Sequence, residues 1–296
     1  MDIEFNALIT NGTWDLVSPT QGTNIVGNKL VFRIKRNADG SIERFKARLV
    51  TKGYHQQPGL DFTETFSLVV KASTIRLVLS LAITRQWTIR QIDIQNAFLH
   101  GQLQEEVYMQ QPQGYVHPDF PHHVCRIKKS LYGLKQAPRA WFSKLTETLL
   151  QLGFVGSKAN TSLFTLHQTT FSIFILIYVD DIIITRTSST EINNFIQRLG
   201  DVFPVKDLGI LSYFLGVEAL FDRLDLFLTQ RKYVANLLQR VNMHEAKPCT
   251  TPMSTTCNYL SLKVQIFSIH NFIEVQLVLY TTWVSLDQTL LSQSTV

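Results

Sequence analysis

Apolar and polar residues alternate along residues 29–34 and again along residues 44–50. Between these segments lies Asn-Ala-Asp-Gly at residues 37–40, a turn-forming composition, so the pattern predicts a β-hairpin. Alternation assigns Phe32, Ile34, Phe45, Ala47 and Leu49 to one face, and Arg33, Lys35, Arg44, Lys46 and Arg48 to the other. The basic face is either a binding surface for an anion or an ordinary solvated surface, because charge runs are usually solvated.

Helical and strand-like patterns follow along the rest of the chain. Apolar residues recur at helical spacing in four segments, residues 73–86, 138–153, 188–200 and 229–241. Ser188 and Glu191 have the spacing of a capping box, and Gly200 is the expected end of that helix. Short apolar runs predict strands at residues 88–94, 171–178, 182–185 and 211–218. The mixture predicts an α+β fold with a partly antiparallel sheet.

Composition narrows the class of protein. The chain has 296 residues, 45% of them hydrophobic, and a net charge of +5, which allows a real core and favours a polyanionic partner without establishing one. Cys125, Cys249 and Cys257 lack a close-pair motif, so neither a disulfide framework nor a four-thiolate zinc site is expected. The acidic N-terminus and the lack of a membrane-length apolar stretch predict an intracellular protein that is not secreted.

Two adjacent carboxylates, Asp180 and Asp181, separate two apolar runs where an ordinary hairpin would prefer Asn-Gly or Asp-Gly. Carboxylates this close repel each other unless a cation balances them, so the pair is a candidate metal site. A simple polar turn is the alternative. Asp93 ends another apolar run and is a second candidate ligand, although an Asp in such a position is more often the N-cap of a helix. His117, His122, His123 and Cys125 match no standard zinc spacing.

Ten short motifs occur in one order: residues 11–14 (NGTW), 31–35 (VFRIK), 45–50 (FKARLV), 74–76 (TIR), 93–99 (DIQNAFL), 107–109 (VYM), 131–141 (LYGLKQAPRAW), 178–181 (YVDD), 207–209 (DLG) and 213–216 (YFLG). Each motif alone is a weak signal. Their joint order and spacing resemble the reverse transcriptases of copia-type long-terminal-repeat retrotransposons over about residues 5–258. By this resemblance the chain is a fragment of a Pol polyprotein.

The resemblance implies a right-hand polymerase fold of the α+β class, with fingers, a palm of antiparallel sheet plus helices, and a partial thumb. The implied reverse transcriptase domain covers residues 5–258, with fingers at about 24–90, palm at about 91–225 and the start of the thumb at about 226–250. A degenerate, unstructured tail is expected at residues 259–296. The activity implied is RNA-directed DNA polymerisation, a nucleotidyl transfer of dNTPs onto a primer.

The resemblance also implies a two-metal site. Asp93 and Asp180 would bridge two Mg²⁺ ions, with the Ile94 carbonyl assisting and Asp181 nearby, and Mn²⁺ is a possible substitute. Lys46, Arg48, Phe98 and Gln136 would bind the dNTP, Lys46 and Arg48 by neutralising the triphosphate and Phe98 by excluding a 2′-hydroxyl. The residues implied to contact primer and template are Tyr178, Tyr213, Leu215, Gly216, Arg231 and Lys232.

The implied partners are an RNA template, a DNA or RNA primer and dNTPs, with no membrane, and the oligomeric state stays open. The implied location is the cytoplasm, in a retrotransposon particle, or the nucleus. Leu30, Leu68, Arg186 and Ile210 depart from the family pattern, and Arg186 stands where Gly is usual, close in sequence to the metal carboxylates. Arg186 and the altered tail favour one alternative, a catalytically inactive relic that still binds nucleic acid. A second alternative is a metal-dependent phosphohydrolase that uses the same carboxylates.

Overall fold

The computed structural model describes residues 2–36, 41–65, 70–186, 189–222 and 225–245. They form two compact units, one built from residues up to 214 together with 219–227, the other from residues 215–218 and from 228 onward. The predicted turn at residues 37–40, the capping residue Ser188 and the expected tail at residues 259–296 lie outside the described residues.

A six-stranded sheet is the centre of the first unit. Its strands are β12 (Val205–Ile210), β5 (Thr88–Ile94), β11 (Asp181–Arg186), β10 (Ser172–Tyr178), β9 (Leu163–His167) and β8 (Val155–Gly156), in that spatial order. Each neighbouring pair is antiparallel. The sequence predicted the three central strands to within a residue, and the expectation of an antiparallel sheet is confirmed.

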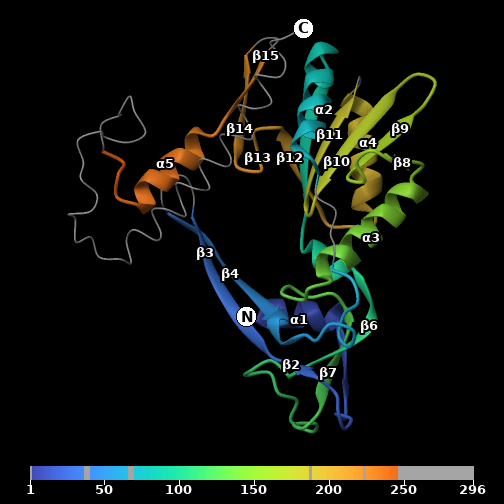
Figure 1. The fold of residues 1–296 in the computed structure, drawn as a ribbon, viewed down its shortest axis with the longest axis vertical. Helices are drawn as coiled ribbons and strands as arrows, with labels where there is room; N and C mark the ends of the chain where they lie inside the picture. Colours follow the sequence, from blue (N-terminus) through green and yellow to red (C-terminus); the bar gives the residue numbers. More distant parts are fainter. Residues whose placement is uncertain (1, 37–40, 66–69, 187–188, 223–224, 246–296) are drawn as a thin grey trace, which may run out of the picture. The chain divides into compact units, whose positions relative to one another are not determined.

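Helices pack on both faces of this sheet (Figure 1). Ile175, Ile177, Ile182 and Ile184 point to one face, where they share a buried cluster with α3 (Ala137–Gln151) and α4 (Ser189–Gly200). Leu176 and Ile183, the alternate residues, point to the other face and pack with α2 (Ala72–Thr84). Because successive strand residues alternate between faces, the continuous apolar runs of β10 and β11 are explained by burial on both sides.

A four-stranded sheet forms the second core of this unit. Its strands are β1 (Trp14–Val17), β7 (Val124–Lys129), β6 (Gln102–Met109) and β2 (Ile25–Val26). Helix α1 (Asp2–Thr10) contributes Leu8 to the same buried cluster. Residues from before and after position 91, the expected boundary between fingers and palm, pack together in this cluster. Helix α2, which precedes position 91, packs on the six-stranded sheet instead.

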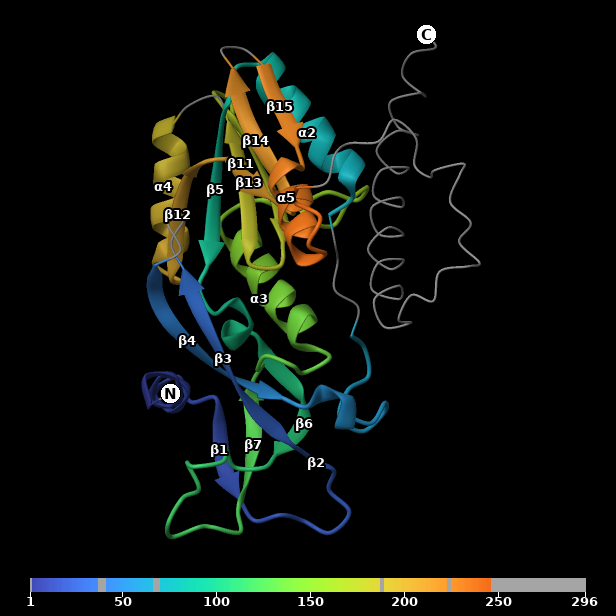
Figure 2. The same cartoon turned by 90° about the vertical axis from the view of Figure 1, so that its left-hand side faces the viewer.

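The predicted basic hairpin is present as a two-stranded ribbon, β3 (Asn28–Arg36) and β4 (Ile42–Thr51), visible in both views (Figures 1 and 2). Its register pairs Arg33 with Lys46 and Lys35 with Arg44, while Ile34 pairs with Phe45. Directly paired residues share a face, so the predicted division into a basic and an apolar face is confirmed. The apolar face is not covered near its free end, where Phe32 is 68% exposed and Phe45 is 75% exposed.

The predicted strand at residues 211–218 is instead two strands joined by a tight turn. Strands β13 (Tyr213–Phe214), β14 (Val217–Asp222) and β15 (Asp225–Thr229) form a three-stranded sheet. Leu215 (φ 51°) and Gly216 (φ 83°) form the turn, and positive φ at both central residues is typical of a two-residue hairpin loop. The last predicted helix is α5 (Arg231–Arg240) in the second unit. Among the described helices, none is long and apolar enough to cross a membrane.

Candidate active site

The sheet brings Asp93 and Asp181 side by side although they are far apart in the sequence. They are direct partners in the register between β5 and β11, so their side chains lie on the same face. Asp180 precedes β11, and its backbone oxygen accepts a hydrogen bond from the Ile94 amide at 3.0 Å. The sequence could not show that these residues meet, and the strand register supplies that link.

The turn that carries Asp180 has an unusual backbone and an internal support. Val179 has a φ of 57°, a conformation that is rare for a β-branched residue and that favours glycine. The indole Nε1 of Trp141 donates a hydrogen bond to the Val179 oxygen at 2.7 Å, and Trp141 is only 1% exposed. Strained residues of this kind persist only where their surroundings hold them, so Trp141 fixes the position of the carboxylate turn.

Electrostatics in the site disfavour the ionised carboxylates when no cation is bound. Burial raises the pKa of Asp93, and the neighbouring Asp180 raises it further, while Lys46 and Lys206 oppose the shift. Burial also raises the pKa of Asp181, again with a contribution from Asp180, against a hydrogen bond from Gln91. Desolvation and like charge both favour protonation, so a divalent cation would relieve both effects.

The donor chemistry fits a hard divalent cation, because carboxylate and carbonyl oxygens are the ligands that Mg²⁺ prefers. Asp93, Asp180 and Asp181 offer these donors from two adjacent strands and the turn between β10 and β11. Within the described part of the chain, no three His, Cys, Asp or Glu side chains converge closely enough to hold an ion as they stand. The Ile94 amide donates to the Asp180 backbone oxygen, and the ligand role of the Ile94 carbonyl stays a prediction.

Lys46 and Arg48 lie on the basic face of β4 and are half-buried, unlike the exposed residues nearer the free end of the ribbon. Burial lowers the pKa of Lys46, neighbouring Arg48 and Arg44 lower it further, and Asp93 raises it. The ribbon therefore holds its inner cations within electrostatic range of the carboxylate site. The Nε of Arg48 is buried and has no hydrogen-bond partner among the described residues, so it can still donate to a ligand.

Phe98 lies in a short 3₁₀ helix, Ala97–His100, that follows β5 directly. Its ring packs against two of the three buried clusters, the one under α3 and α4 and the one of the four-stranded sheet. It also meets the Tyr132 ring edge to face, with 5.1 Å between the centroids. The guanidinium of Arg48 stands 4.4 Å from the centroid of the same tyrosine. Burial raises the pKa of the Tyr132 phenol, Arg48 opposes this, and Asp180 and Asp93 add to it, which places all of these groups in one neighbourhood.

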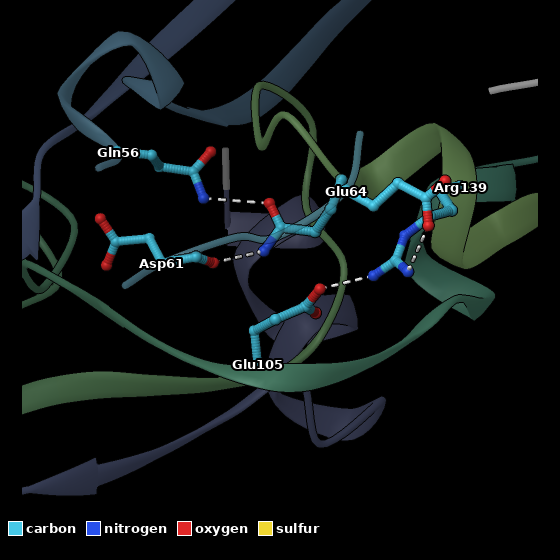
Figure 3. A network of polar contacts seen from close by, with 6 residues as sticks. Gln56, Asp61, Glu64, Glu105 and Arg139 are labelled. Carbon is cyan, nitrogen blue, oxygen red and sulfur yellow. Dashed lines mark hydrogen bonds and ion pairs between the residues drawn. The ribbon is translucent and has the colours of Figure 1, made fainter. Parts of the chain in front are cut away.

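Gln136, which the motif predicted to contact the nucleotide, has an internal position in the structure. Its side chain is 0% exposed, its oxygen accepts from Gln56 Nε2 at 3.0 Å, and its nitrogen donates to the Asp61 backbone oxygen at 2.9 Å. Figure 3 shows Gln56 and Asp61 around this amide, with Arg139 bonded to Glu105 close by. The geometry gives Gln136 a bracing role between two loops, and its direct contact with a nucleotide stays a prediction without structural support.

The residues predicted to contact primer and template fall in both units. Tyr178 is the direct partner of Asp181 in the β10–β11 register, and its ring meets Phe214 at a centroid distance of 6.4 Å. Tyr213 belongs to the same unit, whereas Leu215 and Gly216 form the turn between β13 and β14. Arg231 and Lys232 begin α5 in the second unit, and both are exposed. Their roles stay predictions.

Arg186, which departs from the family pattern, lies away from the carboxylates, and its effect on activity stays a prediction. It occupies the opposite end of β11 from Asp181. Its guanidinium stacks on the Phe171 ring at 3.6 Å from the centroid, and Nη1 lies 3.3 Å from a Glu191 oxygen. Only 2% of its surface is exposed, and its buried Nε has no hydrogen-bond partner among the described residues.

Four residues of this neighbourhood escaped the sequence reasoning. Trp141 and Tyr132 were recognised only as parts of a motif, and nothing in the pattern indicated which side chains of that motif reach the site. Lys206 is the partner of Asp93 in the register between β12 and β5. Glu4 lies near Arg48, where burial raises its carboxyl pKa and Arg48 lowers it. Only the tertiary structure brings Glu4 and Lys206 to the site.

The chain matches one protein family over most of its length. Residues 11–255 match the family described as reverse transcriptase (RNA-dependent DNA polymerase). The chain belongs to the reverse transcriptase family.

Curated relatives place the chain among transposon Pol polyproteins. It is 51% identical over 255 residues to the Retrovirus-related Pol polyprotein from transposon RE1 of Arabidopsis thaliana, covering 86% of this chain and 17% of that protein. It is 51% identical to the corresponding RE2 polyprotein of the same plant, over 86% of this chain and 18% of the relative. The TNT 1-94 polyprotein of Nicotiana tabacum is 39% identical, over 86% of this chain and 19% of that protein. The resemblance to retrotransposon reverse transcriptases is confirmed, and the chain spans less than a fifth of these relatives.

Proposed function

We propose that this chain is an RNA-directed DNA polymerase that joins dNTPs to a primer on an RNA template. The observation that carries the proposal is the register of β5 and β11, which pairs Asp93 with Asp181 and sets Asp180 in the adjoining turn. Family membership supports the same reaction, because the matched family is described as RNA-dependent DNA polymerase.

Each part of the site has a task in this reaction. Asp93 and Asp180, with Asp181 beside them, would hold two Mg²⁺ ions. When bound, such ions lower the pKa of the attacking hydroxyl and stabilise negative charge on the transferred phosphoryl group. Trp141 keeps the Asp180 turn in place through the Val179 oxygen. Lys46 and Arg48 would neutralise the triphosphate, and Phe98 would exclude the 2′-hydroxyl of a ribonucleotide.

The inactive relic was favoured by Arg186 and by the expected degenerate tail. The position of Arg186 at the far end of β11 from Asp181, beside Glu191, weakens the first argument, and the tail lies outside the described residues. A phosphohydrolase would use the same carboxylates, but it has no use for a sugar-selecting ring such as Phe98. The proposed polymerase gives a role to both the carboxylates and the basic face of the ribbon, so we favour it over these two alternatives.

Extension of a primed RNA template by residues 1–296 with Mg²⁺ and dNTPs tests the proposal. We expect extension by the wild-type chain and none by an Asp180→Asn, Asp181→Asn double variant. A folded wild-type chain that binds the primed template without extending it would support the relic. Release of phosphate or nucleotide without a primer would support the phosphohydrolase.

A further inference from the structure

Tyr132 lies between two residues with different predicted tasks. One side of its ring meets Phe98, the predicted sugar-selecting residue, at 5.1 Å between centroids. The guanidinium carbon of Arg48, the predicted triphosphate ligand, lies over the ring at 4.4 Å from its centroid. A cation over an aromatic face is attracted by the ring's electrons, and an edge-to-face ring pair has a preferred geometry. The tyrosine ring is therefore in contact with both residues at once.

The backbone of Tyr132 is anchored to the same strand that carries Arg48. Its carbonyl oxygen accepts two hydrogen bonds from Thr51 in β4, one from the amide at 2.8 Å and one from the hydroxyl at 3.0 Å. Arg48 precedes Thr51 by three residues on this strand. The distance between the tyrosine ring and the arginine is therefore set by a direct backbone connection rather than by long flexible segments.

Two glycines make this connection tight. Gly133 has a φ of +93°, and a Cβ there would lie 2.1 Å from the Thr51 oxygen. A Cβ on Gly53 would lie 1.9 Å from the Gly133 oxygen. Neither position has room for a side chain, so the chain after Tyr132 and the chain after β4 meet backbone to backbone. This close approach leaves the Tyr132 ring little freedom to move away from Arg48.

We propose that Tyr132 is a positioning residue that couples Arg48 to Phe98, so that dNTP affinity and selection against ribonucleotides depend on one ring. The inference rests on the proposed polymerase function and deepens it. Arg48 supports the coupling because its buried Nε has no partner among the described residues and remains available for a phosphate. A ring that only filled space would leave nucleotide selection unchanged when replaced.

Nucleotide binding on a primer that ends in a 3′-dideoxynucleotide tests the coupling without requiring chemistry. Affinities for a dNTP and the matching ribonucleotide are measured for the wild type, Tyr132→Leu and Tyr132→Phe. We expect Tyr132→Leu to weaken dNTP binding roughly threefold to thirtyfold and to lower the preference for dNTP over ribonucleotide. Tyr132→Phe keeps the ring and should stay within about twofold of the wild type in both values.

Phe154→Leu is the matched control, because Phe154 is a buried aromatic that pairs with Phe195 in the main core instead. It should lower thermal stability while leaving both affinities within about twofold of the wild type. Selection unchanged in Tyr132→Leu, or changed equally in Phe154→Leu, would overturn the proposal.

Double variants show whether Tyr132 acts through its two neighbours. In a Phe98→Ala background, adding Tyr132→Leu should change sugar preference no further, and in an Arg48→Met background it should weaken dNTP binding no further. Fully additive effects would mean that Tyr132 contacts the nucleotide independently, which contradicts a positioning role. A wild type that binds dNTP selectively but does not extend a primer would contradict the proposed activity and still leave the Tyr132 test decisive. A folded wild type that binds no nucleotide would overturn both.

Discussion

Two β-hairpins of the same unit supply the opposite charges of the proposed site, and they are built differently. The β10–β11 hairpin carries Asp180 and Asp181, while Asp93 lies on the neighbouring strand β5. Helices cover both faces of this hairpin, with Ile175, Leu176, Ile183 and Ile184 buried beneath them. The β3–β4 ribbon carries the cations and has one apolar face largely exposed beyond its base. The proposed metal ligands are thus backed by a packed core, while the proposed phosphate ligands stand on a two-stranded ribbon.

This difference fits the proposed roles of the two hairpins, metal binding and triphosphate binding. Two metal ions need ligands fixed to within a fraction of an ångström, which a core-backed sheet with a supported turn provides. Lys46 and Arg48, the proposed triphosphate ligands, lie on a ribbon that has no such core on both faces. Near the base of the ribbon, Leu49 is buried and Thr51 bonds to Tyr132, so Lys46 and Arg48 lie on its better supported half.

Removing a metal ligand should have the largest effect. Asp93→Asn is expected to reduce primer extension by at least about a thousandfold, because metal binding contributes several kcal/mol to the transition state. Steady-state extension assays at saturating Mg²⁺ measure this. Asp201→Asn, which removes an exposed carboxylate from the same unit, should leave the rate unchanged. Comparable losses in the two variants would contradict a specific metal site.

Removing the hydrogen bond that supports the carboxylate turn should have the second-largest effect on activity. Trp141→Phe keeps most of the buried ring but leaves the Val179 oxygen without its donor, at a cost of about 1–3 kcal/mol. We expect the extension rate to fall roughly tenfold to a hundredfold with little change in template binding. Trp87→Phe removes an indole from a different part of the unit and should leave the rate near the wild-type value. A rate unaffected by Trp141→Phe would show that the turn needs no support.

A single change on the ribbon should act on binding rather than on the chemical step. Lys46→Gln removes one positive charge facing the site and is expected to raise the KM for dNTP by about tenfold with a smaller change in kcat. Lys158→Gln, a change at an exposed residue outside the ribbon, is the control. A large fall in kcat with an unchanged KM would mean that Lys46 takes part in the reaction itself.

The stability of the chain should depend on Mg²⁺ and pH together. The pKa values of Asp93 and Asp181 are raised in the folded protein. Protonation of the two carboxyls therefore stabilises the fold below the ordinary carboxyl pKa, and this stabilisation is lost as the pH rises through the raised values. Mg²⁺ binds the ionised forms and should raise the unfolding temperature at about pH 8 but hardly at about pH 4. Thermal unfolding in Mg²⁺ and in EDTA measures this. An equal Mg²⁺ effect at both pH values would locate the binding elsewhere.

The smallest effect on activity is expected at the far end of β11. Arg186→Gly should leave extension within about twofold of the wild type, since Arg186 contacts Phe171 and Glu191 rather than the carboxylates. It should lower the unfolding temperature, because a glycine removes the buried contacts with Phe171 and Glu191 at the end of β11. Arg186→Met, which keeps apolar contact with Phe171, should lose less stability. Faster extension by Arg186→Gly would show that the arginine hinders the site after all.

The sequence alone predicted the central strands and the ribbon well, because their patterns are local. The apolar runs around Asp180 and Asp181 and the alternation at residues 29–50 require no knowledge of distant partners. The four-stranded sheet was not predicted, since β1 is a strand of only four residues and pairs with β7 more than a hundred residues later. Such short strands are stabilised by tertiary packing more than by their own pattern.

In the candidate site, too, residues in local motifs were predicted and contacts between distant segments were not. Motif resemblance indicated Asp93, Asp180, Asp181, Lys46 and Arg48, and the structure brings these residues together. Motif resemblance could not show whether Gln136 or Tyr132, two residues of one motif, lies beside the proposed nucleotide ligands. The structure buries the glutamine against Gln56 and Asp61 and places the tyrosine beside Arg48 and Phe98.

The central claim is that the paired strands β5 and β11 assemble a two-metal centre. Its most direct test is the number of Mn²⁺ ions bound, measured by electron paramagnetic resonance on the complete chain with a dideoxy-terminated primer, template and matching dNTP. We expect two ions per chain in the wild type, with tight binding of both lost in Asp93→Asn and unchanged in Asp201→Asn. Two ions retained in Asp93→Asn, or none bound by the folded wild-type complex, would contradict the claim.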